Sequence, residues 1–191
     1  MIYSLKGKLI AKRENFFVVE VGGVAFKVFS SANVLKSLQQ IGAEVNVFTY
    51  LHVREDALEL FGFLNPDELR MFELLNSISG IGPKSALGIL SVDKMENLKA
   101  AIVEGRPELL TKASGVGQKT AERVILELRG KLKQEGAKEL VGMMESDGDI
   151  VEALAGLGYT KNQAKQAVSK VGAKITKTED RIKEALKILK Q

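Results

Sequence analysis

The feature that most constrains this chain is a short glycine motif that occurs twice. Residues 79–86 read SGIGPKSA and residues 114–121 read SGVGQKTA, so the first glycines, Gly80 and Gly115, lie 35 residues apart. In each copy an apolar residue separates two glycines, and a lysine follows two positions after the second glycine. This arrangement is typical of a tight turn that ends one helix and begins the next. The repeat therefore predicts two helix-hairpin-helix units in one region of the chain.

Each copy has the chemistry of a phosphate-binding site. The first amide groups of a helix lack partners within the helix and lie at the positive end of its dipole. Glycines permit backbone angles that are closed to other residues, and they let an anion approach the main chain. Two such units favour a protein that follows the backbone of duplex DNA. The expected contacts are Gly80, Gly82, Lys84, Ser85, Gly115, Gly117, Lys119, Thr120 and Arg123.

Structural explanations of these residues stay open at this point. A single Gly-x-Gly is equally typical of a helix C-cap, and only the repetition with lysine at the same offset favours a function. Arg123 lies one helical turn beyond Lys119, on nearly the same face, where it would reach a neighbouring phosphate. Its alternative role is an ion pair with Glu127, four residues further along the helix.

The sequence argues against catalysis by this chain alone. The P-loop pattern for nucleotide hydrolysis is absent, because the spacing around Lys119 does not fit it. A glycosylase with a lysine nucleophile also needs a downstream aspartate, but position 137 is alanine, so Lys119 is interpreted as an anchor. With no cysteine and one histidine, His52, we expect no catalytic residue, metal or cofactor, and we interpret His52 as structural.

The expected fold is multidomain α+β. Residues 1–63 alternate with strand period around a glycine pair at 22–23, with one short helix predicted for residues 31–40. Five strands and a helix in this length indicate an OB-fold β-barrel, with other small barrels as alternatives. In residues 64–133 the period becomes helical, with Asn65 as a predicted cap before Pro66 and capping-box spacing at residues 93–96. We therefore expect an all-α tandem helix-hairpin-helix domain in this region.

The last third of the chain divides into a tether and a small helical domain. Residues 134–147 lack sustained periodicity and carry a net charge of −3, so we expect a flexible linker. Residues 148–191 carry +4 and predict three short helices, with Thr160 and Thr178 as caps. Such a small bundle suits partner binding better than catalysis. Because no apolar run approaches a membrane span and the first residues do not resemble a signal peptide, we expect a cytoplasmic protein without membrane partners.

One charged turn lies between the last two predicted strands. Arg54, Glu55 and Asp56 form a hairpin tip there, which alone would be an ordinary surface turn. In a DNA-binding chain, two carboxylates at a tip would repel phosphates and favour one DNA shape.

Taken together, these motifs closely resemble the RuvA family of bacterial Holliday-junction DNA-binding subunits. The resemblance rests on the order and spacing of the charged tip, the string LFGF at residues 60–63 and the two glycine motifs with Arg123. It implies that Glu55 and Asp56, flanked by Arg54, form an acidic pin at the junction centre. It also implies a UBA-like three-helix bundle at residues 148–191, whose first loop is Leu157, Gly158 and Tyr159, as the partner-binding region. One departure is Gln118, where family members often carry a second lysine.

The resemblance further implies a function. Members hold four-way junction DNA open and planar as a homotetramer or octamer, and they recruit the hexameric ATPase RuvB for branch migration in recombination, DNA repair and the SOS response. The RuvC resolvase is a further implied partner. The motor is thus a separate chain, and this chain is not an enzyme on its own. The alternative is a non-catalytic, duplex-binding accessory subunit of a repair nuclease.

Overall fold

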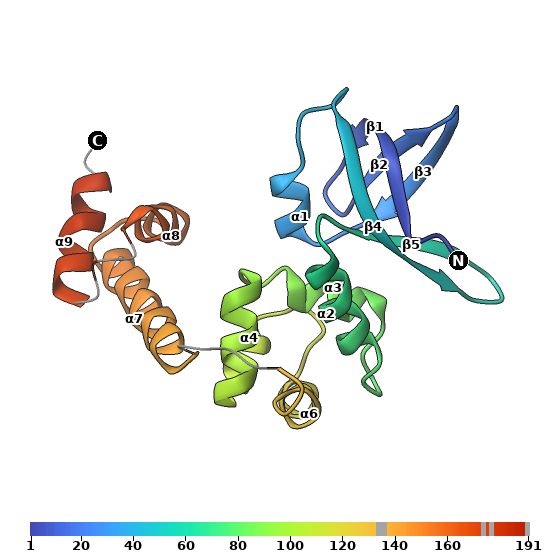
Figure 1. Cartoon of the computed structure of the whole chain (residues 1–191). Helices are drawn as coiled ribbons and strands as arrows, with labels where there is room; N and C mark the ends of the chain where they lie inside the picture. The colour runs from blue at the N-terminus through green and yellow to red at the C-terminus, as the bar shows by residue number, and fades with distance from the viewer. Residues whose placement is uncertain (133–136, 173–174, 176–177, 190–191) are drawn as a thin grey trace. The chain divides into compact units, whose positions relative to one another are not determined.

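The computed structural model describes residues 1–132, 137–172, 175 and 178–189. The chain divides into two compact units, Met1–Gln134 and Glu135–Gln191, each with its own apolar core. Figure 1 shows a β-barrel and a group of helices in the first unit and a small helical bundle in the second.

The first part of unit one is a closed five-stranded barrel. Its strands are β1 (Ser4–Lys12), β2 (Phe16–Val21), β3 (Val24–Phe29), β4 (Glu44–Val53) and β5 (Leu58–Phe63). They follow the order β1-β2-β3-β5-β4, with β4 pairing back onto β1, and only the short β3–β5 pairing is parallel. Alternate side chains fill the interior because successive residues of a strand face opposite sides. Fully buried examples are Leu9, Phe17, Val19, Val28 and Val47.

This barrel confirms the predicted OB-fold. The turn between β2 and β3 lies at the glycine pair, as expected. A methyl group at Gly62 would lie 2.4 Å from a methyl carbon of Val28, so the string LFGF needs a glycine at its third position. Helix α1 (Ala32–Ser37) is shorter than predicted, since the chain leaves helical geometry at Leu38, which is buried in the barrel core.

Five helices complete unit one, and the first of them packs against β4 and β5. They are α2 (Pro66–Asn76), α3 (Pro83–Leu90), α4 (Met95–Glu104), α5 (Pro107–Leu110) and α6 (Gln118–Leu128). Phe72 of α2 packs against three barrel side chains, with ring centroids 5.0 Å from Phe63, 5.4 Å from Phe61 and 5.3 Å from Tyr50. Phe61 and Phe63 thus belong to the apolar core of the helices, while the barrel interior has a core of its own. This contact holds α2 against the strands.

Local signals set most of these helix starts. Asn65 caps α2 as predicted, since its side chain accepts from the amide of Glu68 at 2.9 Å. The capping box expected at residues 93–96 is wrong, because Lys94 is the N-cap residue of α4 and forms no side-chain cap. The carboxylate of Asp93 instead accepts from the amide of Lys94 and from the side chain of Asn97.

Unit two consists of α7 (Ala137–Gly156), α8 (Lys161–Lys170) and α9 (Thr178–Leu189). Thr160 caps α8 with a capping box to Gln163, as expected. The expectation of an irregular tether over residues 134–147 is wrong from Ala137 onward, where α7 begins, while residues 134–136 lie outside the described part. The helix is stabilised by contacts distant in sequence: Arg181, which is 3% exposed, donates two hydrogen bonds to Asp147 at 2.8 and 2.9 Å.

Candidate nucleic-acid interface

The two glycine motifs form two hairpins of similar geometry. The first joins α2 to α3, and the second joins α5 to α6. Gly80 (φ +88°) and Gly115 (φ +78°) occupy the left-handed region, which other residues avoid because of their Cβ atom. The apolar residues between the glycines, Ile81 and Val116, are 4% and 5% exposed and anchor each turn in the core.

The second glycine of each motif has a different role. Gly82 and Gly117 are the N-cap residues of α3 and α6, with extended backbone angles and no side-chain cap. Nothing lies within 4 Å of a methyl group placed on either residue. The fold therefore does not require glycine at these two positions, and the bare helix starts stay open to an approaching ligand.

The first turn of each following helix presents donors to solvent. Helical bonding begins with the amides of Ala86 and Ala121, which donate to the carbonyl oxygens of Gly82 and Gly117 at 3.0 Å. The amides before them lack helical acceptors, since the first turn of a helix has none. They belong to Lys84, Ser85, Gln118, Lys119 and Thr120.

Lys84 and Lys119 are exposed at these helix starts. Among residues 1–132 and the rest of the described chain, neither side chain has an ion-pair partner. Gln118, the departure from the family pattern, donates to Glu122 at 2.8 Å, so its amide is held along the surface of α6. The charge at the second hairpin thus comes from Lys119 and not from position 118.

Arg123 connects the two hairpins. Its guanidinium donates to the carbonyl oxygen of Ser79 at 2.8 Å. Ser79 is the first residue of the first glycine motif and lies 44 residues away in sequence. The ion pair with Glu127 considered from the sequence is not the contact that holds this side chain. A methyl group at Gly88 would lie 3.4 Å from the carbonyl oxygen of Ser114, so α3 also closely approaches the second hairpin. The sequence did not predict either contact.

Hydrogen bonds shape the entry to the second hairpin. Helix α5 begins after Arg106, whose side chain forms an ion pair with Glu108. The pKa of the Glu108 carboxyl is lowered mainly by a hydrogen bond from its own backbone amide. A hydrogen bond from the side chain of Arg106 is the second cause. This carboxylate is therefore charged at neutral pH and lies in the first turn of α5, where a negative charge favours the helix dipole.

The charged tip joins β4 to β5 as predicted. The amide of Arg54 donates to the carbonyl of Ala57 at 2.9 Å and closes the turn. The side chain of Arg54 pairs with Asp56 at 3.3 Å, and in the described structure Glu55 has no such partner. All three charged residues are exposed. Next to the tip, Val53 and Leu58 expose 64% and 74% of their surface, which sequence reasoning did not single out.

The remaining candidates lie elsewhere in the chain. His52 on β4 lies among aromatic rings, 6.4 Å from Tyr50 and 6.3 Å from Phe61 between centroids, in keeping with a structural role. In unit two, Leu157 is 66% exposed at the end of α7, while Tyr159 packs against the core of the bundle.

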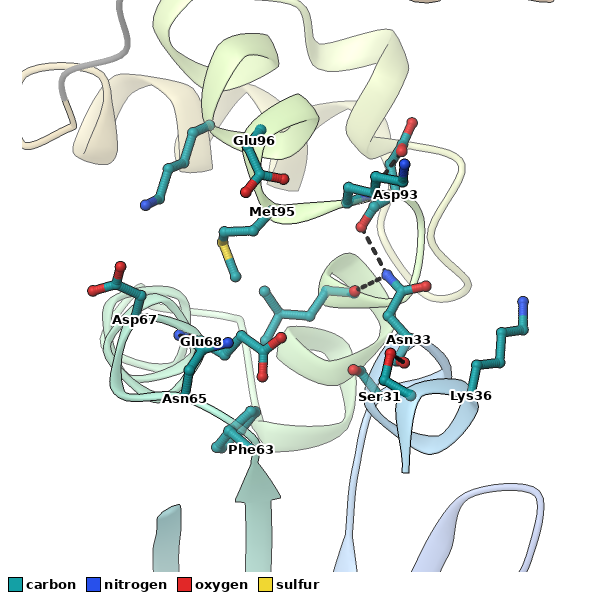
Figure 2. Close-up of a pocket in the computed structure, with 14 residues that line it drawn as sticks. Ser31, Asn33, Lys36, Phe63, Asn65, Asp67, Glu68, Asp93, Met95 and Glu96 are labelled. Carbon is teal, nitrogen blue, oxygen red and sulfur yellow. Dashed lines mark hydrogen bonds between the residues drawn. The ribbon is translucent and has the colours of Figure 1, made fainter. Parts of the chain in front are cut away.

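A cleft of about 480 Å³ lies between α1, α2 and the start of α4. Figure 2 shows its lining, in which the side chain of Asn33 donates to the carbonyl oxygens of Leu90 and Asp93 at 2.8 and 2.7 Å. Acidic and basic side chains alternate around it, including Glu68, Glu96 and Lys36. None of the residues that line the cleft belongs to the two glycine motifs or to the charged tip. The two hydrogen bonds of Asn33 connect α1 to the helical part of unit one.

The described residues contain no group of three histidine, cysteine, aspartate or glutamate side chains that could hold a metal ion. Within the same residues, no helix has the length and apolar character needed to cross a membrane.

Comparison with known proteins gives consistent matches along the chain. Residues 1–62 match a family model described as the RuvA N terminal domain, residues 72–131 match a SAM-like helix-hairpin-helix tandem, and residues 148–190 match the RuvA C-terminal domain. The protein named Holliday junction branch migration complex subunit RuvA from Acetivibrio thermocellus is 40% identical over 98% of both chains. Proteins of the same name are 44% identical in Dehalococcoides mccartyi, over 90% of this chain and 89% of that one, and 41% identical in Thermoanaerobacter pseudethanolicus, over 99% of both.

Proposed function

This chain belongs to the RuvA family, and from that membership we propose that it binds four-way junction DNA and acts in branch migration. It holds the junction open and planar and works with RuvB, the ATPase subunit that supplies the motor. The chain itself contributes DNA binding and no catalysis.

The observation that carries the proposal is the pair of hairpins in unit one. Each presents an uncapped helix start with an exposed lysine, and the bond from Arg123 to Ser79 joins one hairpin to the other. Two anion-binding turns held at a fixed separation suit two phosphates of one duplex arm. The proposed backbone contacts remain those expected from the sequence, with Gly82, Gly117, Lys84 and Lys119 closest to the phosphates.

This mode of binding recognises the shape of DNA and not its sequence. Contacts to phosphate position a protein without reading bases. Each neutralised phosphate contributes about 0.9 to the slope of log affinity against log salt, so several hairpins acting together make binding strongly salt-dependent. We propose a homotetramer, with an octamer as its doubled form, since four copies would place two hairpins on each of four arms.

The charged tip provides the preference for a junction. Arg54 offsets the charge of Asp56, which leaves the carboxylate of Glu55 uncompensated at the end of the β4–β5 hairpin. A negative charge at this point repels the phosphates of a continuous duplex. In a tetramer the tips would surround the point where the arms separate without touching one another, so that an open centre avoids the repulsion. Glu55 and Asp56 are therefore proposed as the acidic pin.

Unit two is proposed as the contact for RuvB. It has its own core and an exposed leucine, Leu157, beside the loop at Gly158. RuvC is proposed as a further partner on the assembled junction.

The test is a gel-shift competition between a four-way junction and a duplex of the same sequence, in magnesium and in EDTA, with the protein mass measured in parallel. We expect strong preference for the junction and a mass near four chains. Equal affinity for the two DNAs would support the alternative, a duplex-binding accessory subunit of a nuclease.

The pin is tested in the same assay with the double variant Glu55→Gln/Asp56→Asn. Both changes keep the size of the side chains and remove their charge. Junction binding should stay intact or become tighter, while discrimination against duplex falls. Unchanged discrimination would refute the assignment of the pin.

A further inference from the structure

The β4–β5 hairpin extends beyond the barrel, and the positions that face the barrel interior remain apolar up to its end. Residues directly opposite each other on its inner face are Leu51 with Leu60, and then Val53 with Leu58. Leu60 is 8% exposed because the barrel core covers it, whereas Val53 and Leu58 are 64% and 74% exposed. Figure 1 shows this hairpin extending away from the other strands. The hairpin thus carries an uncovered apolar pair, Val53 and Leu58, on one side.

The surroundings of this apolar pair restrict what can cover it. The pair flanks a turn that holds two carboxylates and one guanidinium, of which only Asp56 and Arg54 neutralise each other. The remaining charge of Glu55 disfavours phosphate groups in its vicinity. A nucleic acid that approaches this hairpin therefore presents its uncharged parts, which are the bases.

We propose that Val53 and Leu58 contact the faces of the innermost bases of the four-way junction. The inference rests on the proposed function and adds a contact to it. In an open, planar junction the innermost base pair of each arm has no neighbour stacked on one side. Apolar side chains can cover such base faces, as they do when proteins insert apolar wedges between base steps. Covering the faces removes apolar surface from water on both partners and favours an open centre.

A second copy of this chain is a poorer occupant for the apolar pair. Two side chains at the end of one hairpin offer far less area than the roughly 800 Å² per partner of a typical stable protein interface. The acidic tips would also repel one another at the separation that such a contact requires. The bases carry no net charge, so neither objection applies to them.

The experiment uses the full chain and a four-way junction with 2-aminopurine, a fluorescent base, at the crossover. This base emits more strongly when it is unstacked. The variant Val53→Thr/Leu58→Thr makes the pair polar, and threonine is a β-branched residue that suits a strand. The matched control is Val24→Thr, since Val24 is also a strand residue beside a hairpin turn and is 56% exposed. Junction affinity and protein mass are measured for each protein.

We expect binding of the parent protein and of Val24→Thr to raise the emission by the same factor. The double variant should give less than half of that rise while its affinity for the junction stays within about threefold. An equal rise in the double variant would overturn the inference and leave the proposed function standing. A reduced mass of the double variant would overturn it in favour of contact between copies. If the parent itself did not prefer the junction, the proposed function would fail, and this inference with it.

Discussion

At the scale of single residues, the two glycines of each hairpin serve different purposes. Gly115 has a left-handed backbone that the turn requires, whereas Gly117 has ordinary extended angles and free space around its Cα atom. The first glycine is thus needed for the fold. The second is explained by the close approach of a ligand to the start of α6.

This difference predicts opposite effects of two substitutions in the same turn. Gly115→Ala should lower the free energy of unfolding by about 1–2 kcal/mol, because alanine is strained at positive φ. Gly117→Ala should change it by less than about 0.5 kcal/mol, since a weaker cap and a less flexible unfolded chain offset each other. Gly117→Ala should nevertheless weaken duplex binding, because its methyl group lies between helix and phosphate. Urea unfolding and a duplex-binding titration check both effects, and normal DNA affinity of Gly117→Ala would argue against the phosphate site.

Lys119 provides the second prediction at this scale. Lys119→Ala should weaken binding to duplexes of different sequence by the same factor, and it should lower the salt slope by about 1 for each contact removed. Fluorescence anisotropy over a series of salt concentrations measures both quantities. The control is Lys170→Ala, which removes an exposed lysine of unit two. A loss confined to one DNA sequence would contradict the role of Lys119 as a phosphate anchor.

At the scale of helices and strands, local signals in the sequence were sufficient where the determining contact is itself local. Asn65 caps α2 through a residue three positions away, and the glycine motifs specify their own turns. The sequence did not predict α7 before residue 148, because its support at Asp147 comes from Arg181, 34 residues later. For the same reason the bond from Arg123 to Ser79 was missed, although both hairpins were predicted.

The contact between α7 and α9 leads to a stability prediction. Asp147→Ala should destabilise unit two by about 2 kcal/mol or more, because it leaves the guanidinium of Arg181 buried without its carboxylate. The partial exposure of Asp147 keeps the loss below that of a fully buried pair. Hydrogen exchange of the amides in α7, α8 and α9 measures the effect within the full chain. Glu152→Ala is the matched control, since its ion pair with Lys161 is exposed on both sides and should contribute less than about 0.5 kcal/mol. Equal exchange rates in the two variants would show that the buried pair is not important for stability.

At the scale of the whole molecule, the two units have separate cores, and the proposed tasks divide between them. The hairpins and the charged tip belong to Met1–Gln134, while the exposed Leu157 belongs to Glu135–Gln191. Because the cores described for the two units have no side chain in common, a surface change in the second should leave DNA binding by the first unaffected. DNA binding and recruitment of the motor are thus expected to be separable.

Leu157→Asp tests this division. The substitution places a charge on a 66% exposed apolar side chain, so it should not unfold the bundle. Affinity for RuvB should fall by about tenfold or more, as for an apolar residue at the centre of an interface, which corresponds to roughly 1.4 kcal/mol. Affinity for the junction should change by less than about twofold, within the usual scatter of a neutral surface change. A pull-down with RuvB, a gel shift with the junction and a branch-migration assay measure the three properties.

The control for this variant is Gln166→Asp, which adds the same charge to an exposed position of α8 in the same unit. Gln166→Asp should retain RuvB binding and branch migration, since a single added charge on a solvated helix face interacts weakly at physiological salt. Equal losses in the two variants would indicate a general effect of charge on unit two and would remove Leu157 as the specific contact. Loss of junction binding in Leu157→Asp would instead show that the second unit takes part in holding DNA, and the proposed division between the units would then be incorrect.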